Sequence, residues 1–230
     1  MNLIFGCSHV LGDELDQELS VNSTVKEKIK YIEDNRFANI LFKLSKQTVK
    51  VHGKSGADNS WIAHKVIEEV DKSTETIKNV IVCWSGPTRM QKIIDGGTFF
   101  LNPLYPGHFS INLKDKFPSI IKDLNRWEEI ESKVFLDLTF CNNMSYHYAN
   151  YIKLYLENKK INFIFIKSVE SDIDLKPLTV QSSNLSFHEF YKDKFKTGKN
   201  GHCLADGHRE WAHYLFSTVG KYIKKNDTII

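Results

Sequence analysis

The stretch LIFGCS at residues 3–8 decides the fold of this 230-residue chain. Its first three residues are wholly apolar and short enough for a strand, and Gly6 marks a turn that leads to Ser8. A strand that is apolar on both faces is typical of a parallel sheet covered by helices on each side. The stretch therefore predicts a buried first strand that delivers a serine to one edge of the sheet.

The rest of the chain alternates between extended and helical patterns. The clearest strand is NVIVCW at residues 79–84, a β-branched run bounded by polar residues. Further strands are predicted at 48–52 and 161–166, and helices at 25–32, 37–44, 60–70, 117–132, 141–158 and 210–224. Because strands and helices alternate, we expect right-handed βαβ units in a three-layer α/β/α domain with a doubly wound, mostly parallel sheet.

Two long segments interrupt this pattern. Residues 86–112 hold three of the five prolines and four of the twelve glycines, and we interpret them as a loop excursion near the site. Residues 167–206 are polar and loop-rich. The whole chain, 1–230, is expected to form a single domain, because its length and its 41% hydrophobic residues suit one sizeable core.

The composition limits the classes of partner and the cellular compartment that we expect for this protein. The net charge is +3 with scattered Lys and Arg, so we expect no nucleic-acid partner. No apolar stretch approaches the about 20 residues that cross a bilayer, and no signal peptide is recognised, so a cytoplasmic or intracellular location is expected, or a virion-associated one if the protein is viral. The four cysteines show no metal-binding spacing, which predicts free thiols and no metal or other cofactor.

Ser8 has a candidate base near the other end of the chain. A serine hydroxyl needs a base within hydrogen-bond reach, and that base needs a third group to orient it. The sequence DGH at 206–208 offers Asp206 and His208 just before the last predicted helix. Taken singly, Ser8 is typical of a turn and residues 206–207 of a plain turn. Their order along the chain favours a catalytic interpretation, in which Ser8 Oγ and the His208 ring meet within about 3 Å.

Three short motifs resemble those of the SGNH (GDSL-like) hydrolases. GCSHVLGD at 6–13 resembles the first motif, in the GCS variant of phage-encoded and bacterial members. GADNSWI at 56–62 resembles the second motif, in which a glycine precedes an asparagine by three positions. DGH at 206–208 and the helix after it resemble the last. The order and spacing of the motifs extend the resemblance over nearly the whole chain.

The resemblance implies a flavodoxin-like sheet and a role for each matching residue. Ser8 would be the nucleophile, His208 the general base, and Asp206 the group that orients His208. The backbone N–H groups of Ser8 and Gly56 would form an oxyanion hole. Asn59 would either hold the loop or approach the oxyanion itself.

The sequence departs from the family pattern in three places. The usual Gly-x-Asn-Asp of the third motif is replaced by WSGPTR at 84–89, which leaves Ser85 or Arg89 to substitute for the missing asparagine donor. Asp206 lies two residues before His208, where three is common. His213 is a rival base, whereas His9 is expected to line the pocket and His202 has no clear role. Arg89 has further interpretations: it could clamp a carboxylate or phosphate, or be a structural arginine paired with an acid.

These observations predict a serine esterase or deacylase that cleaves a small acyl ester, for instance of an O-acetylated carbohydrate. The substrate follows from the family resemblance alone. The alternative is a catalytically weak or inactive SGNH-like domain that serves as a binding or virion component. The missing third-motif asparagine and the Asp206 spacing favour this alternative, and the presence of Ser8 and His208 argues against it. A phosphate-handling activity through Arg89 is a third alternative, although no glycine-rich phosphate loop accompanies it.

Overall fold

Five parallel strands form the central sheet. The computed structural model describes residues 1–94, 97–101, 138–169, 171 and 182–223. The strand order is β2-β1-β3-β6-β7, and each neighbouring pair is parallel. The strands are β1 (Asn2–Gly6), β2 (Lys50–Gly53), β3 (Asn79–Trp84), β6 (Asn162–Lys167) and β7 (Ser182–Ser186). The chain moves outward from β1 to β2 and then crosses to β3 on the other side, so the switch point of this doubly wound sheet lies between β1 and β3.

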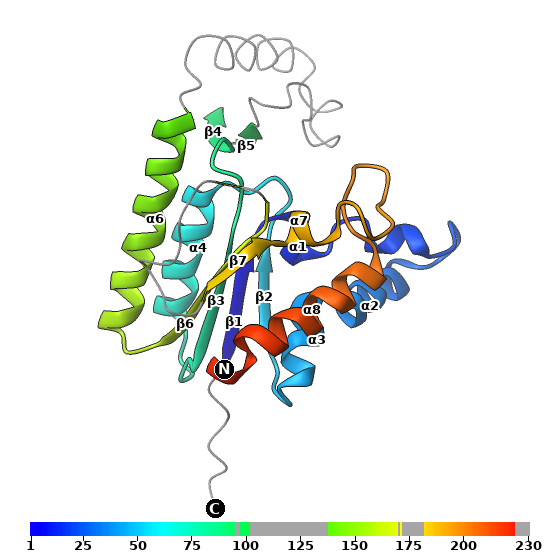
Figure 1. Ribbon diagram of the computed structural model, residues 1–230, viewed down its shortest axis with the longest axis horizontal. Helices are drawn as coiled ribbons and strands as arrows, with labels where there is room; N and C mark the ends of the chain where they lie inside the picture. The colour runs from blue at the N-terminus through cyan, green and yellow to red at the C-terminus, as the bar shows by residue number, and fades with distance from the viewer. Residues whose placement is uncertain (95–96, 102–137, 170, 172–181, 224–230) are drawn as a thin grey trace, which may run out of the picture.

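Helices cover both faces of the sheet, as the sequence predicts (Figure 1). On one face lie α4 (Asn59–Lys72) and α6 (Leu138–Asn158), whose apolar residues form one core with Leu3 and Phe5. On the other face lie α3 (Phe37–Leu44) and α8 (Ala205–Val219), which share a second core with Ile4. Successive side chains of β1 therefore enter opposite cores, which is why its sequence is apolar throughout.

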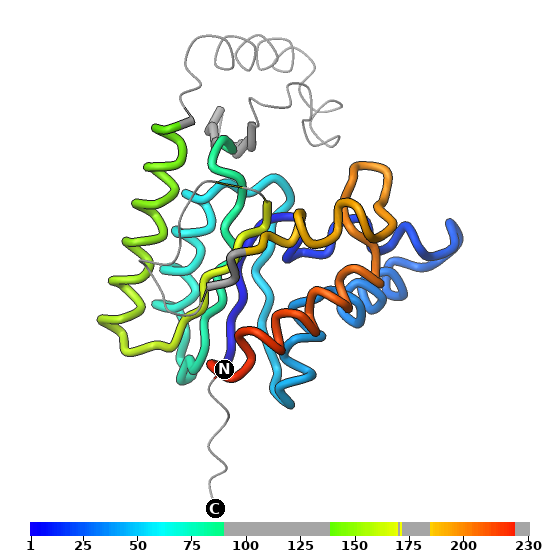
Figure 2. Tube along the Cα trace, viewed as in Figure 1, coloured from blue at the N-terminus to red at the C-terminus, as the bar shows by residue number. Residues whose placement is uncertain are grey.

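The short elements lie mainly beyond the carboxyl ends of the strands. They are α1 (Ser8–Leu11), η1 (Leu15–Glu18) and α7 (Phe187–Tyr191), while α2 (Val25–Asn35) packs outside α3 and η4 (Gly220–Tyr222) follows α8. Figure 2 shows the segment after β1, in blue, beside the orange segment that precedes α8. Two parts of the chain about 190 residues apart, such as Glu14 and His202, thus meet at the sheet edge.

Several predicted elements are confirmed and others need correction. The strand at 79–84 is β3, and the helices at 25–32 and 37–44 are α2 and α3. The excursion 86–112 is not wholly irregular, because it contains the antiparallel pair β4 (Met90–Ile94) and β5 (Gly97–Leu101). Residues 95–96 and 102–112 of that excursion and the predicted helix 117–132 lie outside the described residues.

The loop-rich segment 167–206 also holds structure that the sequence pattern does not reveal. It contains β7 and α7, and α8 begins at Ala205, five residues before the predicted start at 210. The strand β7 has the sequence SSNLS at the edge of the sheet, so it shows neither an apolar run nor β-branched residues. In the described part of the chain, no helix is long and apolar enough to span a membrane. All four cysteines are buried free thiols, as their spacing predicts.

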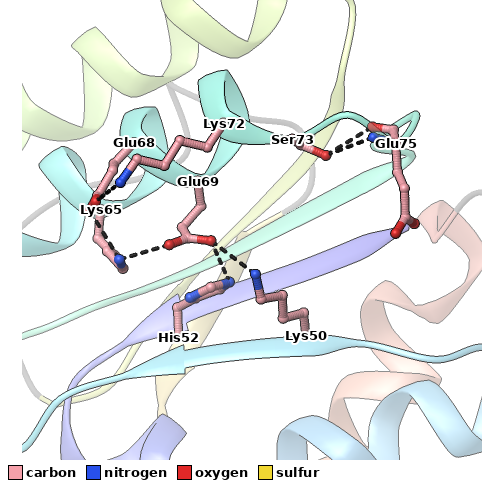
Figure 3. A network of polar contacts seen from close by, with 8 residues as sticks. All are labelled: Lys50, His52, Lys65, Glu68, Glu69, Lys72, Ser73 and Glu75. Carbon is pink, nitrogen blue, oxygen red and sulfur yellow. Dashed lines mark hydrogen bonds and ion pairs between the residues drawn. The ribbon is translucent and has the colours of Figure 1, made fainter.

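A network of charged residues ties α4 to the edge strand β2 (Figure 3). The Glu69 carboxylate lies 2.7 Å from Lys65 Nζ and 3.1 Å from Lys50 Nζ. His52 Nε2 is 3.5 Å from the same carboxylate, but burial lowers the pKa of His52, so the two lysines supply the positive charge at neutral pH. The hydrogen bond from Lys65, helped by that from Lys50 against the opposing effect of burial, lowers the pKa of Glu69 to about 2.

Replacing Glu69 should weaken the fold in a pH-dependent way. Because the pKa of Glu69 is lower in the folded chain than the about 4.3 of an unfolded one, the carboxylate stabilises the fold above that value, and the effect is lost as the pH falls toward 2. We expect Glu69→Gln to lower the free energy of unfolding by about 0.5–1 kcal/mol at pH 7 and by less at pH 3. Urea denaturation at both pH values measures the difference.

Glu75 provides the matched control for this measurement. Its carboxylate has no hydrogen bond or ion pair among the described residues, and only its backbone contacts Ser73 in Figure 3. Glu75→Gln should leave the unfolding curve unchanged at both pH values. Equal effects of the two substitutions would show that the network adds no stability.

Candidate active site

Ser8 lies where β1 turns into α1 at the switch point of the sheet. It is the first residue of α1, and Cys7 before it is the N-cap. A Cβ atom on Gly6 would lie 2.5 Å from Val10 Cγ2 and 3.0 Å from Cys83 Cβ, so only glycine permits this close turn against β3. The Ser8 side chain is buried, and its Oγ lies 2.9 Å from Nε2 of His202.

His202 lies on a hairpin formed by residues 196–204. Gly198 N donates to His202 O at 2.8 Å, and Gly201 N donates to Gly198 O at 3.1 Å. Gly201 has a φ of +84°, the left-handed conformation expected at the last position of a three-residue hairpin loop. The sequence GKNGH at 198–202 is therefore a turn that places a histidine directly after its bend.

The Glu14 carboxylate holds this hairpin in place. It accepts hydrogen bonds from the backbone N–H groups of Asn200 at 2.7 Å and His202 at 2.9 Å, and from Gln17 Nε2 at 2.6 Å. Its Oε2 also lies 3.0 Å from His202 Nδ1. A Cβ atom on Gly198 would lie 2.8 Å from Glu14 Cβ, so a glycine is needed for the hairpin to approach this closely. Burial would raise the pKa of Glu14, but these hydrogen bonds outweigh it and lower the pKa, which keeps the carboxylate ionised at neutral pH.

Ser8, His202 and Glu14 together have the geometry of a serine–histidine–acid triad. With the Nδ1 proton donated to the Glu14 carboxylate, Nε2 of His202 is left with a lone pair directed at the Ser8 hydroxyl. A histidine in this tautomer can accept the serine proton while the carboxylate stabilises the charged ring.

The expected contact between Ser8 and His208 is wrong. The His208 ring is buried against Phe37 and Phe187, and its Nδ1 accepts a hydrogen bond of 3.2 Å from the Phe37 N–H. Phe37 is the first residue of α3, so the His208 ring satisfies one of the unpaired amides of that helix. Burial, and then the nearby His9 and His202, lower the pKa of His208 to about 3, so the ring is neutral at pH 7.

Asp206 does not orient His208 either. Its side chain is 80% exposed and pairs with Arg209 at 3.0 Å, and the rival base His213 is also exposed. The physical reason is the early start of α8, which places Asp206 on the solvent side of its first turn. His208 falls on the apolar stripe with Trp211, Ala212 and Leu215.

A helical stripe at spacings of three, four and seven residues marks a buried face. This spacing is the sequence signal that assigns His208 to the core and leaves His202 as the loop histidine. The sequence contains no comparable indication that Glu14 is the carboxylate beside His202, because nothing in the local pattern around Glu14 points to residues 198–202.

The second motif follows β2, the strand that pairs with β1. Gly56 has a φ of +72° in the turn closed by the Ala57 N to Lys54 O hydrogen bond. Asn59 Oδ1 accepts from Ser85 N at 2.7 Å, while its Nδ2 donates to Ser85 O at 3.1 Å and to Ser145 Oγ at 2.9 Å. Both amide protons of Asn59 are therefore engaged, and they tie α4 to the Ser85 backbone and to α6. Its expected roles, holding the Gly56 loop or approaching the oxyanion, stay predictions.

Four potential hydrogen-bond donors lie in the segments 6–13, 56–62 and 84–89. The backbone N–H groups of Ser8 and Gly56 show no acceptor in the described part of the chain. Within the same residues, Nη1 of Arg89 is buried and unpartnered. The Ser85 hydroxyl is also buried, and it lies close enough to Cys7 to lower the pKa of that thiol.

The charge of Arg89 acts on both neighbours of Ser8. Burial alone would raise the pKa of Cys7, and Arg89 is the largest influence that lowers it. Burial is the main cause of the low pKa of His9, and His202 and Arg89 add to it. Arg89 thus lies close enough to Cys7 and His9 for its positive charge to lower the pKa of both.

Comparison with known proteins supports the fold. No protein-family model matches the sequence, and the search of curated proteins returns no match. Among solved structures, the chain is similar to a carbohydrate esterase family 2 enzyme with a carbohydrate-binding domain from Corynascus thermopiles (Myceliophthora fergusii). The TM-score is 0.54 at 9% sequence identity, and the similarity covers 95% of this chain but 66% of that chain. At this identity the likeness shows the mostly parallel α/β fold that the two chains share.

Cys203 anchors the base of the His202 hairpin to α8, and this contact predicts the effect of a substitution. Cys203 is fully buried, and a Cβ atom on Gly207 would lie 1.9 Å from its Sγ. We expect Gly207→Ala to lower the free energy of unfolding by about 1–3 kcal/mol through overpacking. Urea denaturation measures the loss, and the double variant Gly207→Ala/Cys203→Ala should recover most of it. An unchanged midpoint in the single variant would mean that α8 and the hairpin are not packed as described.

Proposed function

We propose that this chain is a serine esterase of the SGNH type, with Ser8 as nucleophile, His202 as general base and Glu14 as the carboxylate that orients His202. The observation that carries the proposal is the continuous contact from Ser8 Oγ to His202 Nε2 at 2.9 Å and from His202 Nδ1 to Glu14 Oε2 at 3.0 Å. The resemblance of residues 6–13 to the first motif of that family and the similarity to a carbohydrate esterase support it.

The geometry allows a two-step acyl transfer. Ser8 Oγ attacks the ester carbonyl carbon while its proton moves to Nε2 of His202, and the tetrahedral intermediate collapses as His202 returns the proton to the departing alcohol. A water molecule then gives a proton to His202 and attacks the acyl group on Ser8, which releases the acid and restores the serine hydroxyl. Glu14 keeps the ring in the required tautomer and stabilises its charged form throughout.

The oxyanion would be stabilised by groups other than the usual third-motif asparagine. The N–H groups of Ser8 and Gly56 are the backbone donors, and Asn59 contributes by holding the Ser85 backbone instead of donating itself. The unpartnered Nη1 of Arg89 is the donor we assign to the place of the missing asparagine, with the Ser85 hydroxyl beside it. One such donor is typically worth about 3–4 kcal/mol of barrier.

The proposed substrate is a small acyl ester of a carbohydrate, such as an O-acetylated sugar. The similar solved structure is a carbohydrate esterase, which supports a carbohydrate ester as the substrate class. Oxygen esters of alcohols also suit a site that lacks one of the usual oxyanion donors, because they are easier to cleave than amides. The charge of +3 with scattered basic residues suggests neither nucleic acid nor membrane as a partner.

A second proposal is a binding module that keeps the fold but does not catalyse. Two observations favour it: the third-motif asparagine is missing, and Ser8 is only 1% exposed. This function would replace the first if the folded protein does not react at Ser8.

Covalent labelling with a fluorophosphonate probe tests the triad. Because only a hydroxyl activated by a nearby base attacks phosphorus quickly, labelling should disappear in Ser8→Ala and slow by about 10²–10⁴-fold in His202→Ala. Glu14→Gln should slow it as well, since an amide cannot hold the His202 ring in the same way. Hydrolysis of p-nitrophenyl acyl esters by the same variants measures the catalytic consequence.

His208→Gln serves as the control, because a glutamine oxygen can still accept the Phe37 N–H at the start of α3. It should retain labelling even if it loses stability. Labelling that survives in His202→Ala but vanishes in a folded His208→Gln would contradict the assignment of the base. A folded wild type that neither takes the probe nor cleaves a short acyl ester would favour the binding module.

Arg89 can be tested separately from the triad. If Arg89 stabilises the oxyanion, Arg89→Met should lower kcat on neutral p-nitrophenyl acetate by about 10²-fold, the usual effect of losing one donor. Arg209→Met, which removes an exposed arginine on α8, is the matched control and should be neutral. A loss confined to esters that carry a carboxylate would instead assign Arg89 to recognition of an anionic substrate.

A further inference from the structure

A line of buried hydrogen bonds runs behind Ser8 and ends on the His202 hairpin. Cys7 Sγ lies 3.0 Å from Ser168 Oγ, which lies 2.7 Å from His9 Nδ1. His9 Nε2 lies 3.0 Å from Tyr191 Oη, and that hydroxyl donates to Gly201 O at 3.1 Å. The line therefore joins the two neighbours of Ser8 in sequence to the residue that precedes His202.

The Gly201 carbonyl, at one end of this line, determines which atom donates the proton in each of its hydrogen bonds. A carbonyl oxygen can only accept, so the single proton of Tyr191 points to Gly201, and Tyr191 must accept from Nε2–H of His9. Burial keeps the pKa of His9 well below its usual value, which leaves the ring neutral and Nδ1 without a proton. Ser168 then donates to His9 Nδ1, and the thiol of Cys7 donates to Ser168.

Gly201 is the point of the hairpin that most needs an external contact. Its φ of +84° is accessible to glycine, and no heavy atom lies within 4 Å of the place where a Cβ atom would be. Glycine has the greatest backbone freedom of all residues, so packing alone does not determine the orientation of this peptide. Glu14 binds the N–H groups on either side of Gly201, and Tyr191 binds the Gly201 carbonyl.

We propose that Tyr191 is a positioning residue that fixes His202 against Ser8 through the Gly201 carbonyl, with His9 and Ser168 holding its hydroxyl in place. The proposal rests on the proposed function for its effect on activity. The hydroxyl of Tyr191 touches neither Ser8 nor the ring of His202 in the contacts above; it acts on the hairpin that carries the ring. Glu14 and Tyr191 thus hold the N–H and C=O sides of the same turn.

Tyr191→Phe tests this role, because it keeps the ring that packs against Phe187 and removes only the hydroxyl. We expect kcat on p-nitrophenyl acetate to fall about tenfold or more while KM stays within about twofold, since small displacements of a catalytic group mainly slow the chemical step. Tyr214→Phe is the matched control: Tyr214 stacks on Trp211, and its hydroxyl has no hydrogen bond within the described ranges. It should change neither constant.

NMR of the histidine rings gives a second readout that does not require activity. In the wild type, His9 should be protonated on Nε2, and His202 should show a proton on Nδ1 bonded to Glu14. The His202 signal should weaken through faster exchange in Tyr191→Phe and persist in Tyr214→Phe. The opposite tautomer of His9 in the wild type would overturn the proposal even if Tyr191→Phe failed to fold.

The two proposals fail in different ways. A wild type that hydrolyses no ester overturns the proposed function, and the His202 signal then still decides whether Tyr191 positions the ring. An active wild type whose Tyr191→Phe variant retains both kcat and the His202 signal overturns the role of Tyr191 and leaves the esterase proposal standing.

Discussion

The candidate site depends on one interaction, the docking of the hairpin at 196–204 onto the Glu14 carboxylate. A buried carboxylate costs several kcal/mol unless its oxygens are satisfied, and here N–H groups of the hairpin and Gln17 supply the partners. The backbone of Glu14 has a left-handed φ of +71°. This conformation is strained for a residue other than glycine, and proteins keep it where the surrounding structure requires it. Together with the hydrogen bond from Tyr191 to the Gly201 carbonyl, this contact holds His202 over the end of β1.

The helix α8 has two roles: it packs in the second core and it positions the hairpin. The helix α8 follows the hairpin directly, and its buried stripe packs on α3 in the second core, with His208 bonded to the first amide of α3. Cys203 connects the two parts, since it lies in that core while its neighbour His202 faces Ser8. Packing of α8 therefore sets the position of the hairpin base, and Glu14 and Tyr191 set the position of its tip.

Most of the sheet could be predicted from local patterns, because its central strands are buried on both faces. Residues 3–5, 79–84 and 161–166 are apolar or β-branched runs, and each corresponds to a central strand. The local patterns do not predict the edge strand β7 or the pair β4 and β5, because SSNLS at 182–186 lacks an apolar run and the pair lies in a segment rich in Gly and Pro. Burial on two faces leaves a pattern in the sequence that an edge position does not.

By itself, the sequence determined the parallel α/β architecture and the position of Ser8 at the end of the first strand, because apolar runs and the turn at Gly6 are local features. It also contained, in the stripe of α8, the reason why His208 belongs to the core. The pairing of Ser8 with His202 and of His202 with Glu14 was decided only by the tertiary structure. These residues are separated by 194 and 188 positions, and their contacts follow from the strand order and the docking of one hairpin, which no periodicity records.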